Sequence, residues 1–167
     1  MIIQVHYHSS GTPQTDRTRV GLFFNREPVR RDLFYLPIFN STFVIPAGAE
    51  RHTVTASFTT PPLLSTRAIS IFPHMHLLGR EMRVDAVYSD GTRRPMVYID
   101  DWDFNWQAIY YYQKPVSLPP LTRIEVTAVY DNSPSNPNNP NPTPRDVRWG
   151  DQTTDEMCVA FVGITLE

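Results

Sequence analysis

The sequence predicts an all-β protein folded as an antiparallel β-sandwich of jelly-roll type. Its apolar residues mostly alternate with polar ones or form short β-branched and aromatic runs, and both patterns are typical of strands. Proline accounts for 16 of 167 residues, and proline at this frequency interrupts long helices. Turn motifs recur at a spacing of roughly 8–15 residues, which favours many short strands.

We expect a strand wherever such a run is bounded by turn residues. The clearest turns are Ser9-Ser10-Gly11, Pro46-Ala47-Gly48 and Ser89-Asp90-Gly91, with proline pairs at Pro61-Pro62 and Pro119-Pro120. No segment has the caps and periodicity of an amphipathic helix. The predicted strands are Ile2–His8, Arg19–Phe24, Leu33–Phe39, Thr53–Thr59, Ala68–His76, Arg83–Tyr88, Pro95–Ile99, Trp102–Tyr112, Arg123–Tyr130 and Cys158–Leu166.

Composition excludes several classes of protein. Lys and Arg total 15 and Asp and Glu total 17, a formal charge of −2 that argues against a nucleic-acid binder dependent on phosphate contacts. No run approaches the roughly 18 apolar residues of a membrane span. The first residues lack the basic and apolar regions of a signal peptide. A single cysteine excludes an internal disulfide framework and a cysteine-only zinc site.

The segment from Asn132 to Pro144 has an unusual composition. It reads NSPSNPNNPNPTP and contains almost only Asn, Pro and Ser. Such a composition cannot supply a packed core, so we expect a flexible surface loop over residues 132–146.

Two pairs of histidines are the sharpest candidates for chemistry. His74 and His76 lie two apart on a predicted strand, where both side chains point to the same face. Two neighbouring imidazoles can chelate copper or zinc. His6 and His8 repeat the pattern near the N-terminus, which favours a metal. The alternative is that one histidine of each pair is a surface residue and the other a core residue.

Other candidates depend more on context. Met157 offers a soft thioether that suits Cu(I), although an isolated methionine is usually a core residue. Its neighbour Cys158 is expected to be a buried, inert thiol. The aromatic stretch Trp102–Gln107 could pack as an ordinary strand or form the wall of a pocket.

Taken together and in this order, four stretches resemble the copper type II, ascorbate-dependent monooxygenases, the family of peptidylglycine α-hydroxylating monooxygenase and dopamine β-hydroxylase. The most specific combination is an H-x-H-x-x-G-R stretch followed about eighty residues later by E-M-C. The matching stretches are Gln4-Val5-His6-Tyr7, Val44-Ile45-Pro46-Ala47-Gly48, His74-Met75-His76-Leu77-Leu78-Gly79-Arg80 and Asp155-Glu156-Met157-Cys158.

The resemblance implies a domain organisation and a set of metal ligands. Residues 1–27 would be the last strands of a preceding copper domain, and residues 28–167 the C-terminal copper-binding sandwich. In the family, this second domain holds the copper at which dioxygen is used and substrate is hydroxylated. Its ligands would be His74, His76 and Met157, so one copper per chain is expected. His6 would match one ligand of the other copper, whose adjacent His-His pair has no counterpart in this sequence.

Several positions depart from the peptide-hydroxylating members. The residues that hold a peptide carboxylate there correspond to Phe72, Val159 and Phe161 here, and none of these can bind a carboxylate. The substrate pocket is therefore expected to be apolar and to accept a neutral or aromatic, non-peptide substrate. The cysteine next to the methionine is normally disulfide-bonded, but Cys158 has no partner, and Ala128 stands at the expected position.

The resemblance thus implies a copper module that hydroxylates an activated C–H with dioxygen and with ascorbate or another reductant. It also implies a missing N-terminal copper domain, without which this chain alone is expected to be poorly active, and a periplasmic or secreted location. A dimer formed through unpaired strand edges is a further expectation. The alternative is a non-catalytic copper-binding, protein-interaction or carbohydrate-binding module, the last using Trp102, Trp106 and Tyr110–Tyr112 as a stacking platform.

Overall fold

The structure is a computed structural model that describes residues 3, 5, 7 and 10–167. The chain divides into two units, Met1–Arg30 and Arg31–Glu167. The described residues of the first unit form no strand. The strand expected at Arg19–Phe24 is therefore wrong, and its residues Leu22, Phe23 and Phe24 are exposed. The strand expected at Ile2–His8 falls partly outside the described residues.

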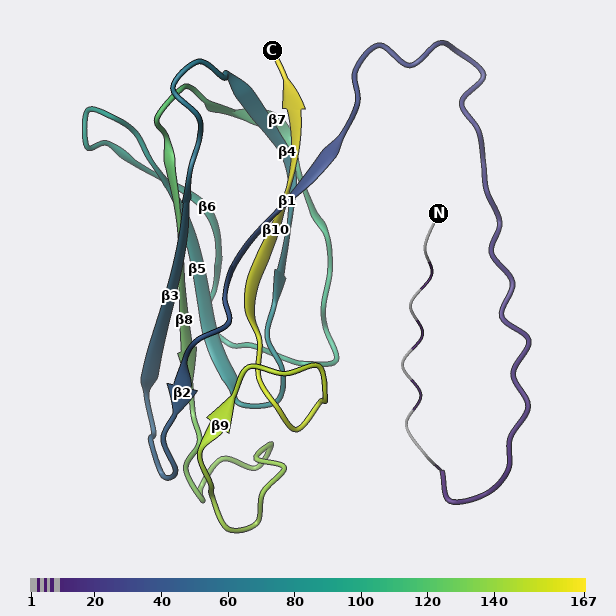
Figure 1. Cartoon of the computed structure of the whole chain (residues 1–167), viewed down its shortest axis with the longest axis vertical. Helices are drawn as coiled ribbons and strands as arrows, with labels where there is room; N and C mark the ends of the chain where they lie inside the picture. The colour runs from purple at the N-terminus through teal and green to yellow at the C-terminus, as the bar shows by residue number, and fades with distance from the viewer. Residues whose placement is uncertain (1–2, 4, 6, 8–9) are drawn as a thin grey trace. The chain divides into compact units, whose positions relative to one another are not determined.

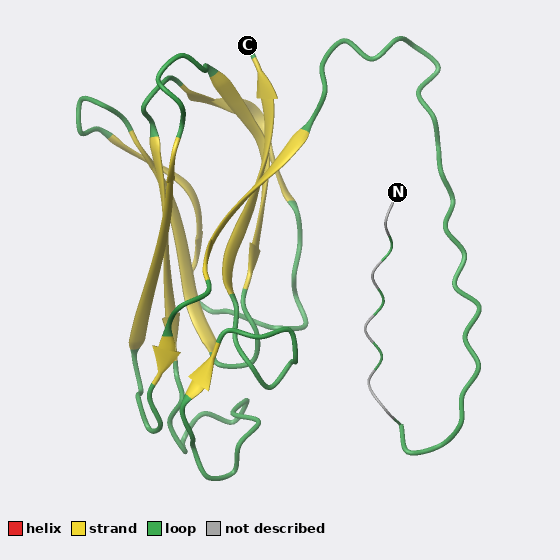
Figure 2. Ribbon diagram, viewed as in Figure 1, coloured by secondary structure: helices red, strands yellow, loops and turns green. Residues whose placement is uncertain are grey.

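The second unit contains ten strands (Figure 1). Figure 2 shows that loops and turns connect them, with no helix in the described part of the chain. No described helix could therefore cross a membrane. In chain order the strands are β1 (Phe34–Asn40), β2 (Val44–Ile45), β3 (His52–Thr59), β4 (Thr66–His74), β5 (Gly79–Val87), β6 (Arg93–Ile99), β7 (Tyr110–Leu118), β8 (Arg123–Tyr130), β9 (Val147–Arg148) and β10 (Cys158–Leu166).

The strands form two four-stranded antiparallel sheets and one small pair. One sheet has the order β1-β10-β4-β7, the other has the order β3-β8-β5-β6, and β2 pairs with β9. Figure 1 shows the two larger sheets as separate layers. The predicted antiparallel β-sandwich is confirmed, while its jelly-roll connectivity stays a prediction.

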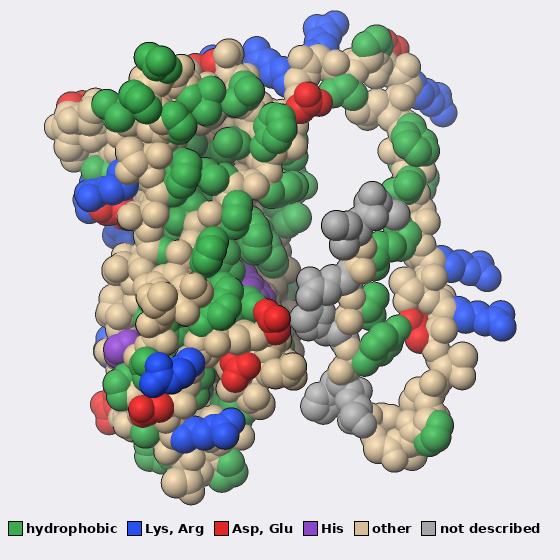
Figure 3. Space-filling view, in the orientation of Figure 1, with side chains coloured by type: hydrophobic (Ala, Val, Ile, Leu, Met, Phe, Trp, Pro, Cys, Tyr) green, Lys and Arg blue, Asp and Glu red, His purple; other side chains and the backbone are tan. Residues whose placement is uncertain are grey.

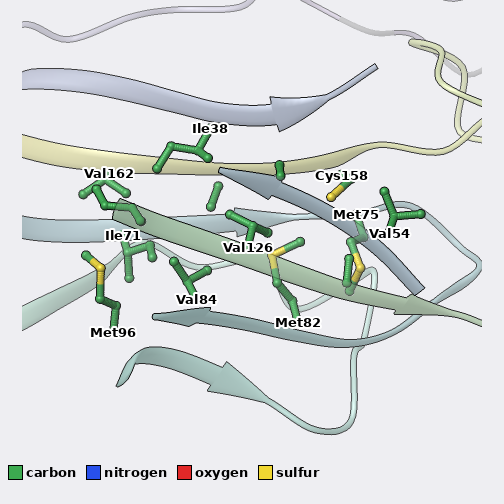
Figure 4. Packing of buried hydrophobic residues seen from close by; sticks show 14 of the residues in the cluster. Ile38, Val54, Ile71, Met75, Met82, Val84, Met96, Val126, Cys158 and Val162 are labelled. Atoms are coloured by element: carbon green, nitrogen blue, oxygen red, sulfur yellow. The ribbon is translucent and has the colours of Figure 1, made fainter. Parts of the chain in front are cut away.

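The core lies between the two sheets (Figure 4). The first sheet contributes alternate residues of β10, among them Cys158, Ala160 and Val162, and these are completely buried. The second sheet contributes Val84 and Val126, which pair across β5 and β8. This alternation leaves the intervening residues of β10 on the outer face of the first sheet.

Several of the predicted strand bounds are wrong. The strand expected at Ala68–His76 is β4, which ends at His74, so His76 lies beyond it, and the strand expected at Arg83–Tyr88 begins already at Gly79. The strand expected at Trp102–Tyr112 begins only at Tyr110 and continues to Leu118, so residues 102–109 form a loop. Trp102 belongs to this loop, and its side chain is buried. Its indole Nε1 donates a hydrogen bond to the backbone oxygen of His76 at 3.1 Å. The short strands β2 and β9 were not predicted, because two-residue strands carry no periodicity.

The Asn/Pro-rich segment packs more closely than its composition predicts. Asn132 and Ser133 are buried. The Asn132 amide nitrogen lies 3.0 Å from the Pro46 oxygen and 2.8 Å from the Arg145 oxygen. Further along, the Asn139 amide nitrogen donates to Asn132 Oδ1 at 3.1 Å. The expectation that this segment cannot pack is therefore wrong at its start, because hydrogen bonds of asparagine amides, rather than apolar contacts, hold it against the domain. Its expected flexibility stays a prediction.

Candidate metal centre

The candidate ligands come from two segments that meet at one end of the first sheet. His74 is the last residue of β4, and His76 follows two residues later. Met157 directly precedes β10. The antiparallel ladder between these strands pairs Val159 with His74, so His76 and Met157 lie beyond the same end of the ladder. The sheet therefore brings together the three residues that the sequence predicted as ligands.

The two imidazoles lie side by side, as their spacing predicted. Their ring centroids are 5.1 Å apart and the ring planes are inclined at 81°. His76 is buried and His74 is half-buried. Phe104 lies edge-on to the His76 ring, with centroids 6.1 Å apart. The pair thus occupies a partly desolvated site with an aromatic neighbour.

Hydrogen bonds define which nitrogen of each imidazole is free. Gln107 Oε1 lies 2.5 Å from His74 Nδ1, while Gln107 Nε2 donates to the Phe104 oxygen at 2.8 Å. With the amide oriented in this way, His74 Nδ1 must be the protonated donor. His76 Nδ1 lies 3.1 Å from the backbone oxygen of Asp155, which can only accept. Both Nε2 atoms therefore carry the lone pair that a metal requires.

Burial also favours the neutral form of these rings. It lowers the pKa of His74, although the hydrogen bond with Gln107 works in the opposite direction, and the neighbouring His76 lowers that pKa further. Burial likewise lowers the pKa of His76, although the Asp155 carbonyl and carboxylate work in the opposite direction. Neutral imidazoles can bind a metal without first losing a proton.

Met157 has a fixed backbone and a half-buried side chain. Its N–H donates to Glu156 Oε2 at 3.1 Å, and its oxygen accepts a hydrogen bond from the Tyr130 hydroxyl at 2.8 Å. Burial raises the pKa of Tyr130 well above its usual value, so this hydroxyl keeps its proton.

These residues fit a copper ion better than a zinc ion. In the described residues, no group of three or more His, Cys, Asp or Glu side chains is placed to hold a metal. A third ligand here would be the Met157 thioether, which is soft and suits Cu(I), whereas zinc sites in proteins use nitrogen, oxygen or thiolate ligands.

The three residues expected to line a substrate pocket lie beside this site. His74 pairs with Val159, and the next row of the sheet pairs Phe72 with Phe161. The two phenylalanine rings stack with centroids 6.0 Å apart and planes at 22°. Val159 is buried but lies outside the core between the sheets. The outer face next to His74 is therefore apolar.

Exposed aromatic residues extend this face. Phe39 and Tyr35 of β1 lie in register with Val159 and Gly163, and both aromatic side chains are about half exposed. On the other edge of the sheet, Tyr111 lies opposite Ser70 and is exposed. Figure 3 shows many hydrophobic side chains exposed on the sandwich.

Other predicted candidates lie elsewhere. His6 and His8 lie outside the described residues. Cys158 is a buried free thiol, and burial raises its pKa to about 12. Ala128, expected opposite it, is also buried in the core.

The expected aromatic platform is only partly formed. Trp106 and Tyr110 line a surface pocket of about 280 Å³ with Asp101 and Asp103. Tyr111 points to the outer face of the sheet instead, as its register opposite Ser70 shows.

Sequence reasoning missed two residues that support the site. The sequence places Gln107 in an aromatic stretch and Glu156 in a family motif, and neither pattern indicates a hydrogen bond to a candidate ligand. Glu156 is completely buried, and burial raises its pKa to about 8, against the effect of three backbone N–H donors. A lone glutamate next to the predicted methionine ligand was the only available signal for its role.

The fold is a β-sandwich in which His74 and His76 lie side by side at the end of one sheet, with Met157 on the neighbouring segment. Residues 29–163 match the family model for the copper type II ascorbate-dependent monooxygenase C-terminal domain. The chain belongs to this family, which is copper- and ascorbate-dependent.

The comparisons with curated proteins and solved structures do not indicate a function. No curated protein matches the chain. Three solved structures of infectious bursal disease virus are 14% identical and cover 82% of this chain: the Gx strain (TM-score 0.38), the VP2 subviral particle (0.35) and the Gt strain (0.33). This chain spans about a third of the length of each, 33%, 32% and 32% respectively. At these TM-scores the likeness carries no argument about function.

Proposed function

We propose that this domain binds one copper ion through His74 Nε2, His76 Nε2 and the Met157 thioether, and that it serves in the hydroxylation of a C–H bond. The observation that carries the proposal is the hydrogen bonding of both Nδ1 atoms to oxygens of Gln107 and Asp155, which leaves both Nε2 lone pairs free. Met157 lies on the neighbouring segment, beyond the same end of the ladder as His76. When bound, copper would supply the one-electron chemistry that dioxygen reduction requires.

The reaction would consume one dioxygen, two electrons and two protons for each C–H converted to C–OH, with one water released. Ascorbate or another reductant would supply the electrons. The chain's own residues would hold the metal and orient the substrate C–H close to it. Gln107 and the Asp155 carbonyl would hold the two imidazoles in one orientation.

The substrate class follows from the face beside His74. Phe72 and Phe161 stack there, and neither can pair with a carboxylate. We therefore propose a neutral, apolar or aromatic substrate rather than a glycine-extended peptide.

The test is hydroxylation of ethylbenzene by the copper-loaded chain in ¹⁸O₂ with excess ascorbate, which can reduce copper directly. A glycine-extended dipeptide is the matched alternative substrate. We expect 1-phenylethanol that contains ¹⁸O, absent in His76→Ala. Turnover of the dipeptide in preference to ethylbenzene would contradict the proposed substrate class.

Saccharide binding is a second candidate function, favoured by the pocket that Trp106 and Tyr110 line with two carboxylates. Binding of a soluble oligosaccharide that persists without copper and is lost in Trp106→Ala would support it.

Three further proposals rest on the resemblance or on sequence alone. We propose that residues 1–27 belong to a preceding copper domain in which His6 is a ligand, that the protein works in a periplasmic or secreted location, and that exposed strand edges allow a dimer.

A further inference from the structure

The sheet does not connect the two ligand segments at the positions of His76 and Met157. The ladder between β4 and β10 ends with the pair of His74 and Val159. His76 and Met157 lie beyond it, so no ladder hydrogen bond fixes one relative to the other. A metal site at this position needs another connection between the segments.

The Asp155 carbonyl supplies one such connection, to the His76 ring, and the carboxyl group of Glu156 supplies the connection between the backbones. Glu156 Oε2 accepts the His76 N–H at 2.8 Å and the Met157 N–H at 3.1 Å. Glu156 Oε1 accepts the Leu78 N–H at 2.6 Å. One oxygen atom thus joins the backbones of two candidate ligands, and the other oxygen extends the connection to the turn after His76.

The backbone of Glu156 is itself braced. Its N–H donates to the Arg148 oxygen at 3.0 Å, and its oxygen accepts the Gly150 N–H at 3.2 Å. These bonds connect it to β9, which pairs with β2. Because the side chain is also completely buried, water cannot replace these acceptors if the carboxyl group is removed.

The chemistry of the side chain suits this role. In its ionised form the carboxyl group offers acceptors at both oxygens and no donor, which matches three converging N–H groups. These three N–H groups stabilise that form against the effect of burial. A glutamine would direct an NH₂ group at one of these donors.

We infer that Glu156 is a positioning residue that holds His76 and Met157 in ligating arrangement before copper arrives. This inference rests on the proposed function, since it assigns Glu156 a role in the same copper site. It predicts that metal affinity depends on a residue that does not itself bind the metal.

The first test compares Glu156→Gln with Asp85→Asn. Asp85 is a buried carboxylate on β5, in the other sheet, where it accepts hydrogen bonds from Arg83 and Arg93. We expect both variants to melt at a lower temperature. Only Glu156→Gln should bind Cu(I) about 10–100-fold more weakly in competition with a chromophoric chelator, with an altered Cu(II) electron paramagnetic resonance spectrum. Wild-type affinity and an unchanged spectrum in Glu156→Gln would overturn the inference.

A second measurement needs no variant and so does not depend on Glu156→Gln folding. In copper-free wild-type protein, the amide hydrogens of His76, Leu78 and Met157 should exchange slowly, because they already bind the carboxyl group. Exchange at the rate of exposed loop amides would overturn the inference. Copper binding that survives in His74→Ala/His76→Ala would instead contradict the proposed function, so the two failures are distinguishable.

Discussion

Among single residues, the partners of the imidazole Nδ1 atoms decide what the site can bind. The Gln107 amide faces His74 with its oxygen because its nitrogen is occupied by the Phe104 carbonyl. The carbonyl of Asp155 plays the same part for His76. Each ring is therefore held as the tautomer with a free Nε2. Residues of this chain supply both of the hydrogen bonds that fix the tautomers.

Gln107 gives the first prediction. Gln107→Leu removes the acceptor for His74 Nδ1, so the ring can rotate or change tautomer. We expect copper affinity to fall by about 10–100-fold. Gln107→Glu keeps an acceptor for His74 Nδ1 but loses the donor to the Phe104 oxygen, so its affinity should fall less than that of the leucine variant. Competition with a chelator measures both, and equal affinity in the leucine variant would show that the hydrogen bond is unimportant.

Met157 gives the second prediction. Met157→Ile keeps an apolar side chain of similar size but removes the thioether. Because Cu(II) is satisfied by imidazole and water whereas Cu(I) favours sulfur, the variant should lose more affinity for Cu(I) than for Cu(II). Separate titrations of the two oxidation states check this. An equal loss of both would indicate a packing defect instead.

At the scale of elements, the loop after β8 is held by asparagine side chains. The Asn132 amide nitrogen lies within hydrogen-bonding distance of the Ile45, Pro46 and Arg145 oxygens, at 3.3, 3.0 and 2.8 Å. One side chain thus links this loop to the end of β2 and to the segment before β9.

Removing this amide should destabilise the domain. We expect Asn132→Ala to lower the free energy of unfolding by about 1–3 kcal/mol, because buried carbonyl groups lose their donor. The exposed Asn138→Ala is the matched control and should change it by less than about 0.5 kcal/mol. Urea unfolding measures both, and equal stability of the two variants would contradict this account of the loop.

The sequence was informative about elements with a strong period and about motifs with fixed spacing. Alternation located β3, β8 and β10 closely. The i, i+2 spacing correctly made His74 and His76 neighbours, although His76 lies beyond the end of β4 rather than on the strand. The sequence could not locate residues 102–109 as a loop, because aromatic residues that pack from a loop look like a strand. It also could not show that Glu156 joins the two ligand segments, since that depends on the pairing of β4 with β10.

In the sandwich as a whole, the core between the sheets keeps Cys158 out of solvent. The thiol is completely buried, and burial raises its pKa to about 12. Burial therefore disfavours the thiolate, which is the reactive form.

Cys158 should therefore report unfolding of the whole domain. We expect no reaction with a thiol-specific disulfide reagent at pH 8 in native protein, and one thiol per chain in guanidinium chloride. The rate in native protein should follow the unfolding equilibrium as denaturant is added. Rapid labelling without denaturant would mean that this part of the core opens independently.

The copper content of the whole chain tests the central claim most directly. Metal analysis after reconstitution and removal of free copper compares wild type with His74→Ala/His76→Ala, and with His6→Ala/His8→Ala as the matched control pair. Our account predicts one copper per chain in wild type, none in the first double variant, and one in the second. Copper that survives the loss of His74 and His76, or that disappears with His6 and His8, would contradict it.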